Sequence, residues 1–295
     1  MPQTSKDIIV KKLFNINQAT GIKEYLEEAE FLKKARSDAE SLKIPIVDDQ
    51  TGRFLELACI LLKPSKILEI GCGTGYSTYF LLKSIFQELT AGLSIGGSGS
   101  IGESCGINER AAKQPDIKAQ EPAAGFEKTN NSKRPFSYTG IDLNRERLGQ
   151  ACLLISGLIN KTILPCQDGR RLKTFIECES FSCSFEFIHG NAVKIIREEP
   201  ETPEKYDLVF IDAAKYQYPD YLEALRDRMA AGCAIIADNI FYNGKIFKEE
   251  TLKHDTNSVA GLTEYLRVIN GEDAFKTSLF NIGDGIALSI YNIDK

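Results

Sequence analysis

The sequence predicts a doubly wound α/β sheet that is mostly parallel and ends in an antiparallel hairpin. Five short apolar segments alternate with segments of helical periodicity, which is the pattern of parallel strands joined by helices. A glycine-rich turn at residues 71–75 joins the first of these strands to a helix. Near the end of the chain, two predicted strands flank Gly283-Asp284-Gly285, whose Asp-Gly pair is typical of a hairpin turn.

The composition is that of an ordinary globular protein. Of the 295 residues, 43% are hydrophobic and 26% are charged, so the chain can bury a sizeable core. We expect one domain that spans residues 1–295. The formal net charge of −5 argues against a broadly basic nucleic-acid surface, although a local basic face is compatible with it.

The sequence also bears on cellular location. No segment approaches the roughly 20 apolar residues that a membrane helix needs, and the first residues do not resemble a secretory signal. We therefore expect a cytoplasmic protein with no membrane partner. The eight cysteines are scattered without a C-x-x-C pair, and several lie in apolar runs, which indicates buried free thiols rather than disulfides.

Residues 1–63 are expected to form a helical segment that precedes the sheet. Apolar residues recur at helical spacing over residues 21–41 among many charges, which predicts an amphipathic helix that packs on a larger body. A second apolar helical face runs from Phe54 to Leu62. This helix should end just before Pro64, because a residue that precedes proline disfavours helical geometry.

The strands and helices of the sheet follow in alternation. Strand 66–70 leads through the glycine turn to helix 76–86, and strand 137–143 leads to helix 145–159. The other predicted strands before the terminal hairpin are 185–189, 206–211 and 233–237, and the other predicted helices are 193–198, 219–229 and 258–269.

Two stretches break the alternation. Residues 91–135 hold seven of the 23 glycines, with many Ser, Asn, Ala and Pro and no sustained periodicity. We expect this stretch to be a disordered insertion, because it cannot bury enough apolar surface to offset the entropy of ordering it. Residues 162–184 are expected to be irregular as well.

The glycine turn predicts a nucleotide-like ligand. Gly71, Gly73 and Gly75 let backbone N–H groups approach a ligand, and the helix that follows points its positive end at the same place. The third glycine comes one position earlier than in the dinucleotide-binding pattern G-x-G-x-x-G. The alternative explanation is structural, because a tight turn from strand to helix needs glycine even without a ligand.

Polar residues or glycines follow every one of the five apolar strands, where ligands of such sheets bind. Asp142 is the expected acid for the ribose hydroxyls. It lies 71 residues after Gly71, or 26 when the 45-residue insertion is left out, and the usual separation is about 20. A helix cap is the alternative role for Asp142, and the two roles can coexist. The residues that follow the third, fourth and fifth strands are Gly190, Asn191, Ala192, Asp212, Asp238 and Asn239.

Three of these residues form a candidate metal site. Asp212, Asp238 and Asn239 offer two carboxylates and an amide carbonyl, with no His or Cys beside them. Oxygen ligands that leave room for water and substrate suit Mg²⁺ better than zinc. Taken alone, Asp238-Asn239 would be explained as turn chemistry, but its combination with the D-x-x-K segment from Asp212 to Lys215 favours a metal site.

The glycine turn, the D-x-x-K segment and the Asp-Asn pair together resemble the metal-dependent catechol and caffeoyl-coenzyme A type O-methyltransferases. The resemblance covers roughly residues 20–87 and 136–293 and implies a Rossmann-like methyltransferase sheet that uses S-adenosylmethionine (SAM). It further implies that Mg²⁺ or another divalent cation is held by Asp212, Asp238 and Asn239, and that Lys215 takes the proton from the acceptor hydroxyl. By the same resemblance, SAM is contacted by Val47, Glu69, Gly71, Ser77, Asp142, Asn191, Ala192 and Asp212.

Within that family the sequence is most similar to the bacterial tRNA 5-hydroxyuridine methyltransferases. The similarity is carried by AESLKIPIVD, FIDAAKYQYPDYL, ADNIFYNGKI and NIGDGIALSI. It implies methylation of 5-hydroxyuridine in the tRNA anticodon loop and a homodimer, with a small catechol-like or phenolic metabolite as the alternative acceptor. The two irregular stretches and the loop GCGTG depart from the family pattern. Because of these two stretches, the resemblance does not determine the entrance to the substrate site.

Other side chains are candidates for acceptor contacts. Either a base or a catechol could stack on aromatic residues near the expected metal ligands, which are Tyr216, Tyr218, Tyr221, Phe241 and Tyr242. RNA could contact basic clusters, although each is also explained as solvated surface; these are Lys11-Lys12, Lys33-Lys34, Lys133-Arg134 and Arg170-Arg171-Lys173.

Two rival functions remain open from the sequence. A nicotinamide-dependent oxidoreductase would use the same kind of sheet, but the early third glycine and the paired carboxylates argue against it. A non-catalytic protein could use the sheet as a scaffold and residues 91–135 as a docking arm.

Overall fold

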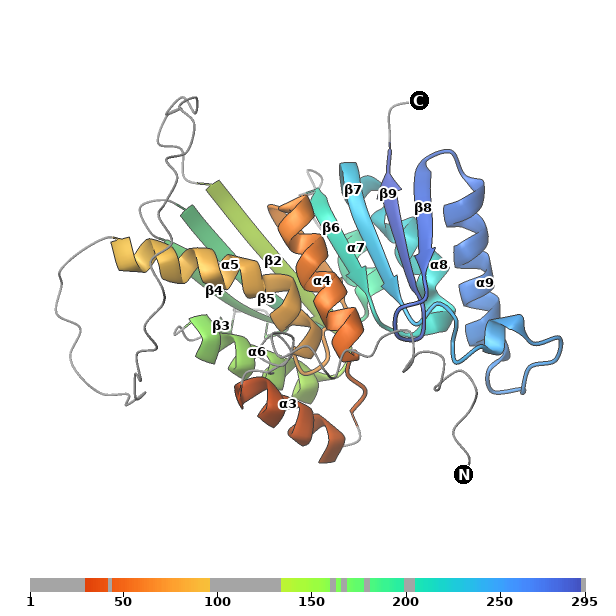
Figure 1. Ribbon diagram of the computed structural model, residues 1–295, viewed down its shortest axis with the longest axis horizontal. Coiled ribbons are helices and arrows are strands. Elements are labelled where there is room, and N and C mark those ends of the chain that lie inside the picture. The colour runs from red at the N-terminus through yellow and green to blue at the C-terminus, as the bar shows by residue number, and fades with distance from the viewer. Residues whose placement is uncertain are drawn as a thin grey trace, which may run out of the picture.

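The structure is a computed structural model, and it describes residues 30–41, 44–95, 134–159, 163–165, 169–177, 181–198 and 205–292. The described strands form one sheet of nine, in the order β3-β4-β5-β2-β1-β6-β7-β9-β8 (Figure 1). Their bounds are β1 Lys66–Ile70, β2 Arg134–Asp142, β3 Leu164–Pro165, β4 Arg171–Glu177, β5 Phe181–His189, β6 Tyr206–Ile211, β7 Met229–Asp238, β8 Phe275–Phe280 and β9 Ile286–Tyr291.

The sheet is doubly wound about β1. This strand pairs in parallel with β2 on one side and with β6 on the other, and β5 and β7 extend the parallel part outward. The terminal hairpin adds β9 antiparallel to β7, and β8 antiparallel to β9. The predicted fold class is therefore confirmed. Because the chain leaves β1 in both directions, the carboxyl ends of β1, β2 and β6 meet at a switch point where such sheets bind ligands.

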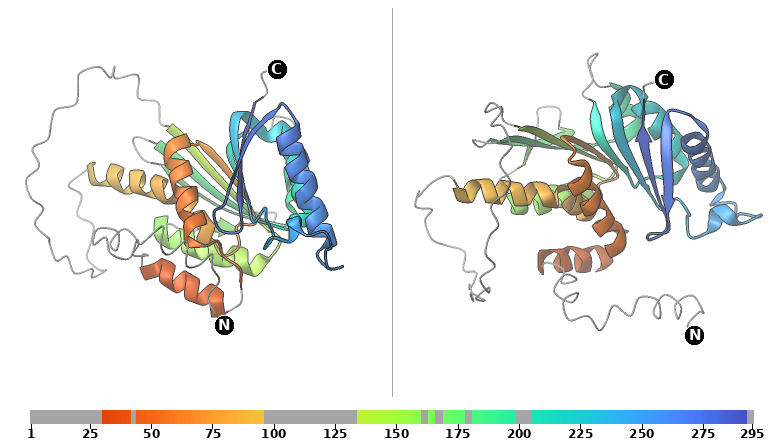
Figure 2. Two further views of the ribbon diagram at one scale, coloured as in Figure 1. Left: turned by 45° about the vertical axis from the view of Figure 1, so that its right-hand side comes forward. Right: turned by 45° about the horizontal axis from the view of Figure 1, so that its top comes forward.

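Helices cover both faces of the sheet, as Figures 1 and 2 show. Alternate residues of β1 face opposite layers: Ile67 packs in the core that contains α4, α5 and α6, and Leu68 packs in the core that contains α7, α8 and α9. The helices are α3 Glu30–Ser41, α4 Asp49–Leu62, α5 Tyr76–Ile95, α6 Arg145–Ile159, α7 Ala192–Glu198, α8 Tyr218–Leu225 and α9 Thr256–Gly271. None of the helices in the described ranges combines the length and apolar character needed to cross a membrane.

Both ends of α4 are capped by its own sequence. The carboxylate of Asp48 accepts hydrogen bonds from the N–H groups of Gln50 and Thr51, at 2.8 and 2.9 Å. Lys63, in a left-handed conformation, donates its N–H to the carbonyl of Cys59 at the other end. The helix ends before Pro64, as the sequence predicts, and leads directly into β1.

The prediction that residues 162–184 are irregular is wrong. The described residues of this stretch form β3, β4 and the first part of β5, and β4 pairs antiparallel with β5. The segment that forms β4 is short, and its sequence RLKTFIE does not keep a regular alternation of polar and apolar residues. The sequence pattern therefore gave only a weak strand signal. The strand forms because it pairs with the open edge of β5, and this tertiary pairing outweighs local preference.

The boundaries of the predicted insertion at 91–135 also change. Helix α5 continues to Ile95, past the predicted end at residue 86, and β2 begins at Arg134. Gly92 lowers helix propensity by only about 1 kcal/mol relative to alanine, so it does not end a helix. The predictions of disorder for residues 96–133, and of a helix for residues 21–29, lie outside the described residues.

Two smaller corrections concern the region around residue 229. The predicted helix 219–229 consists of α8, which ends at Leu225, and a 3-10 turn from Arg226 to Arg228. Strand β7 then starts at Met229 rather than at residue 233. The alanine and glycine residues that open this strand gave no clear strand signal, because neither residue type favours β structure.

A buried carboxylate joins β1, β2 and α5. Glu69 is fully buried, and its carboxylate accepts hydrogen bonds from Ser77 at 2.5 Å, Thr78 at 2.7 Å and Tyr138 at 2.5 Å. Burial raises the pKa of the Glu69 carboxyl, and the three hydroxyl donors oppose that shift. Three hydroxyl groups thus depend on one acceptor to remain hydrogen-bonded in the core.

We expect Glu69→Ala to lower the free energy of unfolding by about 2–4 kcal/mol, because it leaves the hydroxyls of Ser77, Thr78 and Tyr138 buried without this acceptor. Urea denaturation followed by circular dichroism measures this. The control is Glu264→Ala, which removes an exposed carboxylate that pairs with Arg267 on the same helix; it should leave the urea midpoint unchanged. Equal midpoints for the two variants would contradict the prediction.

Candidate active site

The switch point of the sheet holds a cavity of about 440 Å³. This volume lies in the range of small-molecule and cofactor sites. The cavity is bounded by the turn after β1, the carboxyl ends of β2, β5, β6 and β7, and the segments that follow them. Its lining residues are Pro45, Ile70, Gly71, Gly73, Ile141, Asp142, Leu143, Arg147, Gly190, Asn191, Ala192, Asp212, Ala213, Ala214, Lys215, Tyr216, Gln217, Tyr221 and Asn239.

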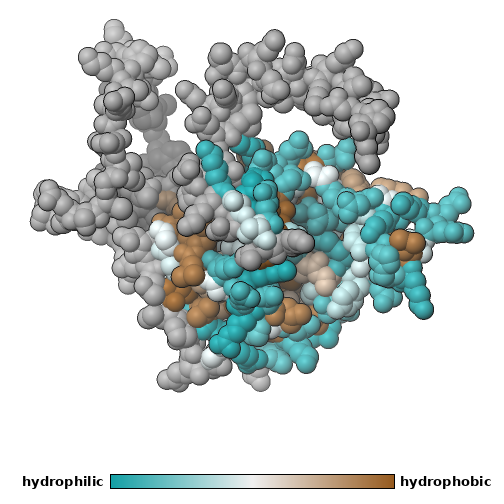
Figure 3. Space-filling view, turned by 90° about the horizontal axis from the view of Figure 1, so that it is seen from below, coloured by the Kyte–Doolittle hydropathy of each residue, from teal (hydrophilic) through white to brown (hydrophobic). Residues whose placement is uncertain are grey.

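The surface at this end of the molecule is mixed in character. Figure 3 shows it from below, with hydrophilic side chains over most of the described area and smaller hydrophobic areas between them. The parallel strands point their carboxyl ends toward this side, as the downward course of β7 in Figure 1 shows.

The glycine turn requires its glycines. Gly71, Gly73 and Gly75 have φ values of 91°, 51° and 87°, which side chains of L-residues rarely adopt. A Cβ on Gly71 would lie 2.1 Å from the carbonyl oxygen of Asp212, at the end of β6. The turn therefore packs backbone against backbone across the switch point, and a side chain at Gly71 would push the two strand ends apart.

Asp142 holds the glycine turn. One oxygen of its carboxylate accepts the N–H of Gly73 at 2.8 Å, and the other accepts the N–H of Asn144 at 2.7 Å. The alternative that Asp142 caps the following helix is not what the structure shows, because Asn144 caps α6 through its bonds from Glu146 and Arg147. Each carboxylate oxygen can accept a further hydrogen bond on its other lone pair, as a ribose contact would require.

Lys215 lies between two of the predicted metal ligands. Its ammonium donates to Asp212 Oδ1 at 2.9 Å, to the hydroxyl of Tyr218 at 2.7 Å and to the carbonyl oxygen of Asp238 at 3.3 Å. The Tyr218 hydroxyl in turn donates to the same carbonyl of Asp238 at 2.8 Å. This network ties the end of β6 to the end of β7.

Asp238 lies beneath the cavity rather than on its wall. The residue is 2% exposed, and the pKa of its carboxyl is raised to about 7, first by burial and then by the negative charge of Asp212. The N–H of Asn239 donates to Asp238 Oδ1 at 2.7 Å and partly opposes that shift. Asn239 itself has a φ of 55° and lines the cavity.

These residues fit a divalent cation. A buried carboxylate beside a second carboxylate is destabilised by repulsion, and a cation between them would remove that cost. The described residues contain no group of three or more His, Cys, Asp or Glu side chains arranged for a metal. Two carboxylates and an amide carbonyl leave several positions for water and substrate, which is the arrangement that Mg²⁺ prefers.

The structure separates the predicted SAM contacts into two groups. Five of them line the cavity: Gly71, Asp142, Asn191, Ala192 and Asp212. The other three, Val47, Glu69 and Ser77, are buried and do not line it; Val47 packs in the core, and Glu69 and Ser77 bond to each other.

Some lining residues were missed by the sequence analysis. Pro45 reaches the cavity from the segment before α4, two residues from the predicted Val47. Arg147 lies in the first turn of α6, after the cap residue Asn144. A position in the first turn after the Asp142 strand end was a usable signal, because helix starts in this fold point toward the ligand end.

The aromatic residues that were candidates for stacking an acceptor include both cavity-lining and core residues. Tyr216, which is 55% exposed, and Tyr221 line the cavity. Tyr218 is fully buried, and burial followed by the charges of Asp212 and Asp238 raises the pKa of its hydroxyl. Tyr218 is therefore a core residue that supports Lys215 and cannot stack an acceptor.

Comparison with known proteins finds similarity over part of this chain. A family model described as O-methyltransferase matches residues 168–291. An Arabidopsis thaliana protein named as a caffeoyl-CoA O-methyltransferase is 26% identical over 145 residues, which are 44% of this chain and 62% of the relative. The match therefore spans less than two thirds of that relative's length.

Solved structures share the fold over nearly the whole chain. A protein from Klebsiella pneumoniae described as an O-methyltransferase has a TM-score of 0.60 at 18% identity, covering 92% of this chain and 94% of its own. TomG of Streptomyces achromogenes, an O-methyltransferase involved in tomaymycin synthesis and solved with SAM, has a TM-score of 0.59 at 17% identity, covering 98% and 96%. The O-methyltransferase of Bacillus cereus, solved with S-adenosylhomocysteine (SAH), has a TM-score of 0.58 at 17% identity, covering 94% and 100%.

Identities this low establish the fold alone. The family match is narrower, but it contains Asp212, Lys215, Asp238 and Asn239, whereas the glycine turn and Asp142 lie outside it. Residues 168–291 of this chain are thus similar to the O-methyltransferase family over the segment that carries the candidate metal ligands.

Proposed function

We propose that this chain transfers a methyl group from SAM to a hydroxyl oxygen of a small catechol-like or phenolic acceptor, with the help of a divalent cation. One observation carries the proposal. The Asp212 carbonyl packs against Gly71 of the nucleotide-type turn, while the Asp212 carboxylate bonds Lys215 and lies near Asp238. The candidate cofactor and metal positions therefore meet at one residue.

The acceptor is proposed as a small molecule because the named relatives are small-molecule enzymes where their names specify a substrate or product. These names are caffeoyl-CoA O-methyltransferase and an enzyme of tomaymycin synthesis. Methylation of 5-hydroxyuridine in tRNA remains the alternative, and it rests on the sequence similarity described above. Both acceptors place a hydroxyl beside a second oxygen, so both suit the same site.

The chain's own residues would bind and orient the cofactor. SAM supplies a methyl group on a sulfonium, which needs no further activation. The glycine turn offers backbone N–H groups, and Asp142, Asn191 and Ala192 line the same cavity. Holding the cofactor and acceptor in line can contribute roughly 7–11 kcal/mol to lowering the barrier.

The acceptor oxygen needs help to lose its proton, since a phenol has a pKa of about 10. Asp212, Asp238 and Asn239 would hold a divalent cation, which stabilises an oxygen anion when bound. Lys215 makes three hydrogen bonds as a donor, and an ammonium has three N–H groups. Lys215 must therefore release one proton before it can take another from the acceptor.

The first test is a methylation assay with purified protein, SAM and Mg²⁺. We expect transfer to catechols, and loss of that transfer when EDTA removes the metal. Hydroxylated tRNA lacking the methyl group is assayed beside them. Methylation of tRNA without turnover of catechols would replace the small-molecule acceptor by tRNA. Absence of SAM binding in calorimetry would overturn the methyltransferase assignment itself.

Asp238→Asn tests the metal site without changing side-chain shape. We expect Mg²⁺-dependent activity to fall by about 100-fold, while SAH affinity stays close to that of the unaltered protein. Mg²⁺ should raise the melting temperature of the unaltered protein but not that of the variant, because only the first binds the ion. The control is Asp220→Asn, at an exposed carboxylate on α8. A full Mg²⁺ response in the Asp238 variant would refute the metal assignment.

Gly71→Ala tests the backbone contact at the turn. The new Cβ would meet the Asp212 carbonyl in a left-handed backbone conformation, so SAH affinity should fall by about tenfold or more. Isothermal titration calorimetry measures the affinity. Gly157→Ala is the matched control, because a Cβ there meets open space on α6. Unchanged SAH binding in the Gly71 variant would show that the ligand lies elsewhere.

A further inference from the structure

A second cavity, of about 480 Å³, lies at the opposite end of the strands. It shares no lining residue with the first cavity. Its walls come from the amino-terminal halves of β2 and β5, from β4, and from the starts of β1 and β6. Neither the family match nor the proposed methyl transfer assigns it a role.

The cavity exists because one face of two interior strands is polar. In β5, Ser182, Ser184 and Glu186 lie on this face, while Cys183 and Phe185 on the other face are buried in the core. The register continues the polar face sideways. Ser184 pairs with Ser137 on β2, and Glu186 pairs with Thr139 on β2 and with Lys173 on β4.

Interior parallel strands are normally apolar on both faces, because helices cover them. On this side of the sheet the short helix α7 packs with the core nearer the carboxyl ends, through Ile195 and Ile196. Among the described residues the polar half of the face is left as an open cavity. Polar groups at such a place can hydrogen-bond water or a polar ligand.

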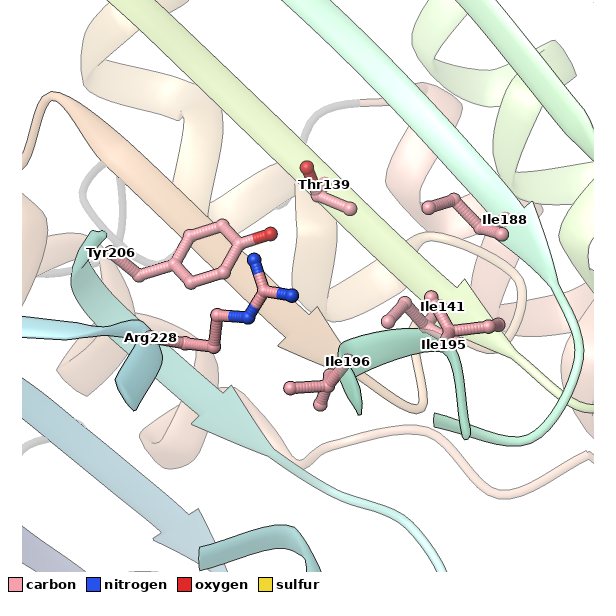
Figure 4. A pocket seen from close by; sticks show the side chains of 7 residues that line it. All are labelled: Thr139, Ile141, Ile188, Ile195, Ile196, Tyr206 and Arg228. Carbon is pink, nitrogen blue, oxygen red and sulfur yellow. The ribbon is translucent and has the colours of Figure 1, made fainter. Parts of the chain in front are cut away.

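Arg228 supplies the main cation of this cavity. It is 7% exposed, and it lines both the large cavity and an adjoining pocket of about 10 Å³. Figure 4 shows its guanidinium directed toward the hydroxyl of Tyr206 on β6, with Thr139 on β2, beyond β1. In the part of the chain that the structure describes, no hydrogen bond or ion pair joins this guanidinium to another residue, and its nitrogens keep some contact with solvent.

The neighbouring Arg226, in the same turn, has its guanidinium paired with two carboxylates. It bonds both carboxylate oxygens of Glu272 at 3.0 Å and Glu223 at 2.7 Å. A buried charge without such partners is costly, whereas a bound anion would remove the cost. The position of Arg228 is therefore explained by a ligand better than by folding stability.

The other charged groups around the cavity favour an anion as well. Lys66, Arg171 and Lys173 line it together with Arg228, and Glu186 is the acidic side chain among the described lining residues. Glu186 is already engaged by Arg171 at 3.2 Å. Among the described lining residues, basic side chains therefore outnumber acidic ones, and serine and threonine hydroxyls can donate hydrogen bonds to an oxyanion.

We propose that this second cavity binds a small phosphate-bearing molecule, with Arg228 as the principal phosphate ligand. A guanidinium matches a phosphate through two parallel N–H bonds. The volume suits one small molecule, and Arg228 is only 7% exposed, so its guanidinium offers little surface to the backbone of a polymer. The ring of Phe175, 56% exposed, provides an apolar contact for the rest of the ligand.

The test is isothermal titration calorimetry on the full chain, with inorganic phosphate and ribose 5-phosphate as probes at constant ionic strength. Arg228→Gln should weaken binding of both probes by about tenfold or more. Arg147→Gln removes one arginine from the first cavity and should leave probe binding unchanged. Thermal unfolding of each variant reports whether it is folded.

Lys173→Gln is a second test variant, needed because Arg228 is buried and its substitution can disturb folding. Lys173 is exposed, so the variant should fold normally and weaken probe binding by about threefold. The proposal is overturned if the unaltered protein binds neither probe, if Arg228→Gln folds and binds as well as the unaltered protein, or if Arg147→Gln shows the same loss. It is also overturned if a single-stranded oligoribonucleotide requires Arg228 for binding while both small probes fail to bind.

Discussion

The contact of Gly71 with the carbonyl of Asp212 is the constraint on which the site depends. It brings the turn after β1 against the end of β6 with no side chain between them. From this contact, the Asp212 carboxylate reaches Lys215, and the network of Lys215 and Tyr218 reaches the carbonyl of Asp238. The spacing between the candidate cofactor and metal positions is thus fixed by backbone packing, which is the most rigid support a sheet offers.

The sequence predicts the strand ends well because their physics is local. An apolar run followed by glycine or a carboxylate defines both a strand and its carboxyl end, and in this fold those ends share one edge. Gly71, Asp142, Asp212 and Asn239 accordingly line one cavity. The roles of Glu69 and of β4 could not be predicted in the same way. The burial of Glu69 depends on hydroxyls from α5 and β2, and β4 exists because β5 offers it an edge.

The two ends of the sheet bury charges of opposite sign. At the carboxyl end, Asp238 is buried near Asp212, and the resulting negative charge favours a cation. At the amino end, Arg228 is buried beside a cavity whose described lining residues are more often basic than acidic, and the positive charge favours an anion. One sheet therefore keeps two sites of opposite charge apart by the length of its strands, so a ligand of one is repelled by the other.

One of the two edge strands of the sheet, β3, has only two residues, Leu164 and Pro165. A proline has no N–H to donate, and two residues offer too little backbone for another chain to pair with. The extension of the sheet by β4 therefore ends in a strand that discourages further growth. At Leu172 and Lys173, the edge of β4 is therefore covered by a strand that offers little backbone for edge-to-edge association.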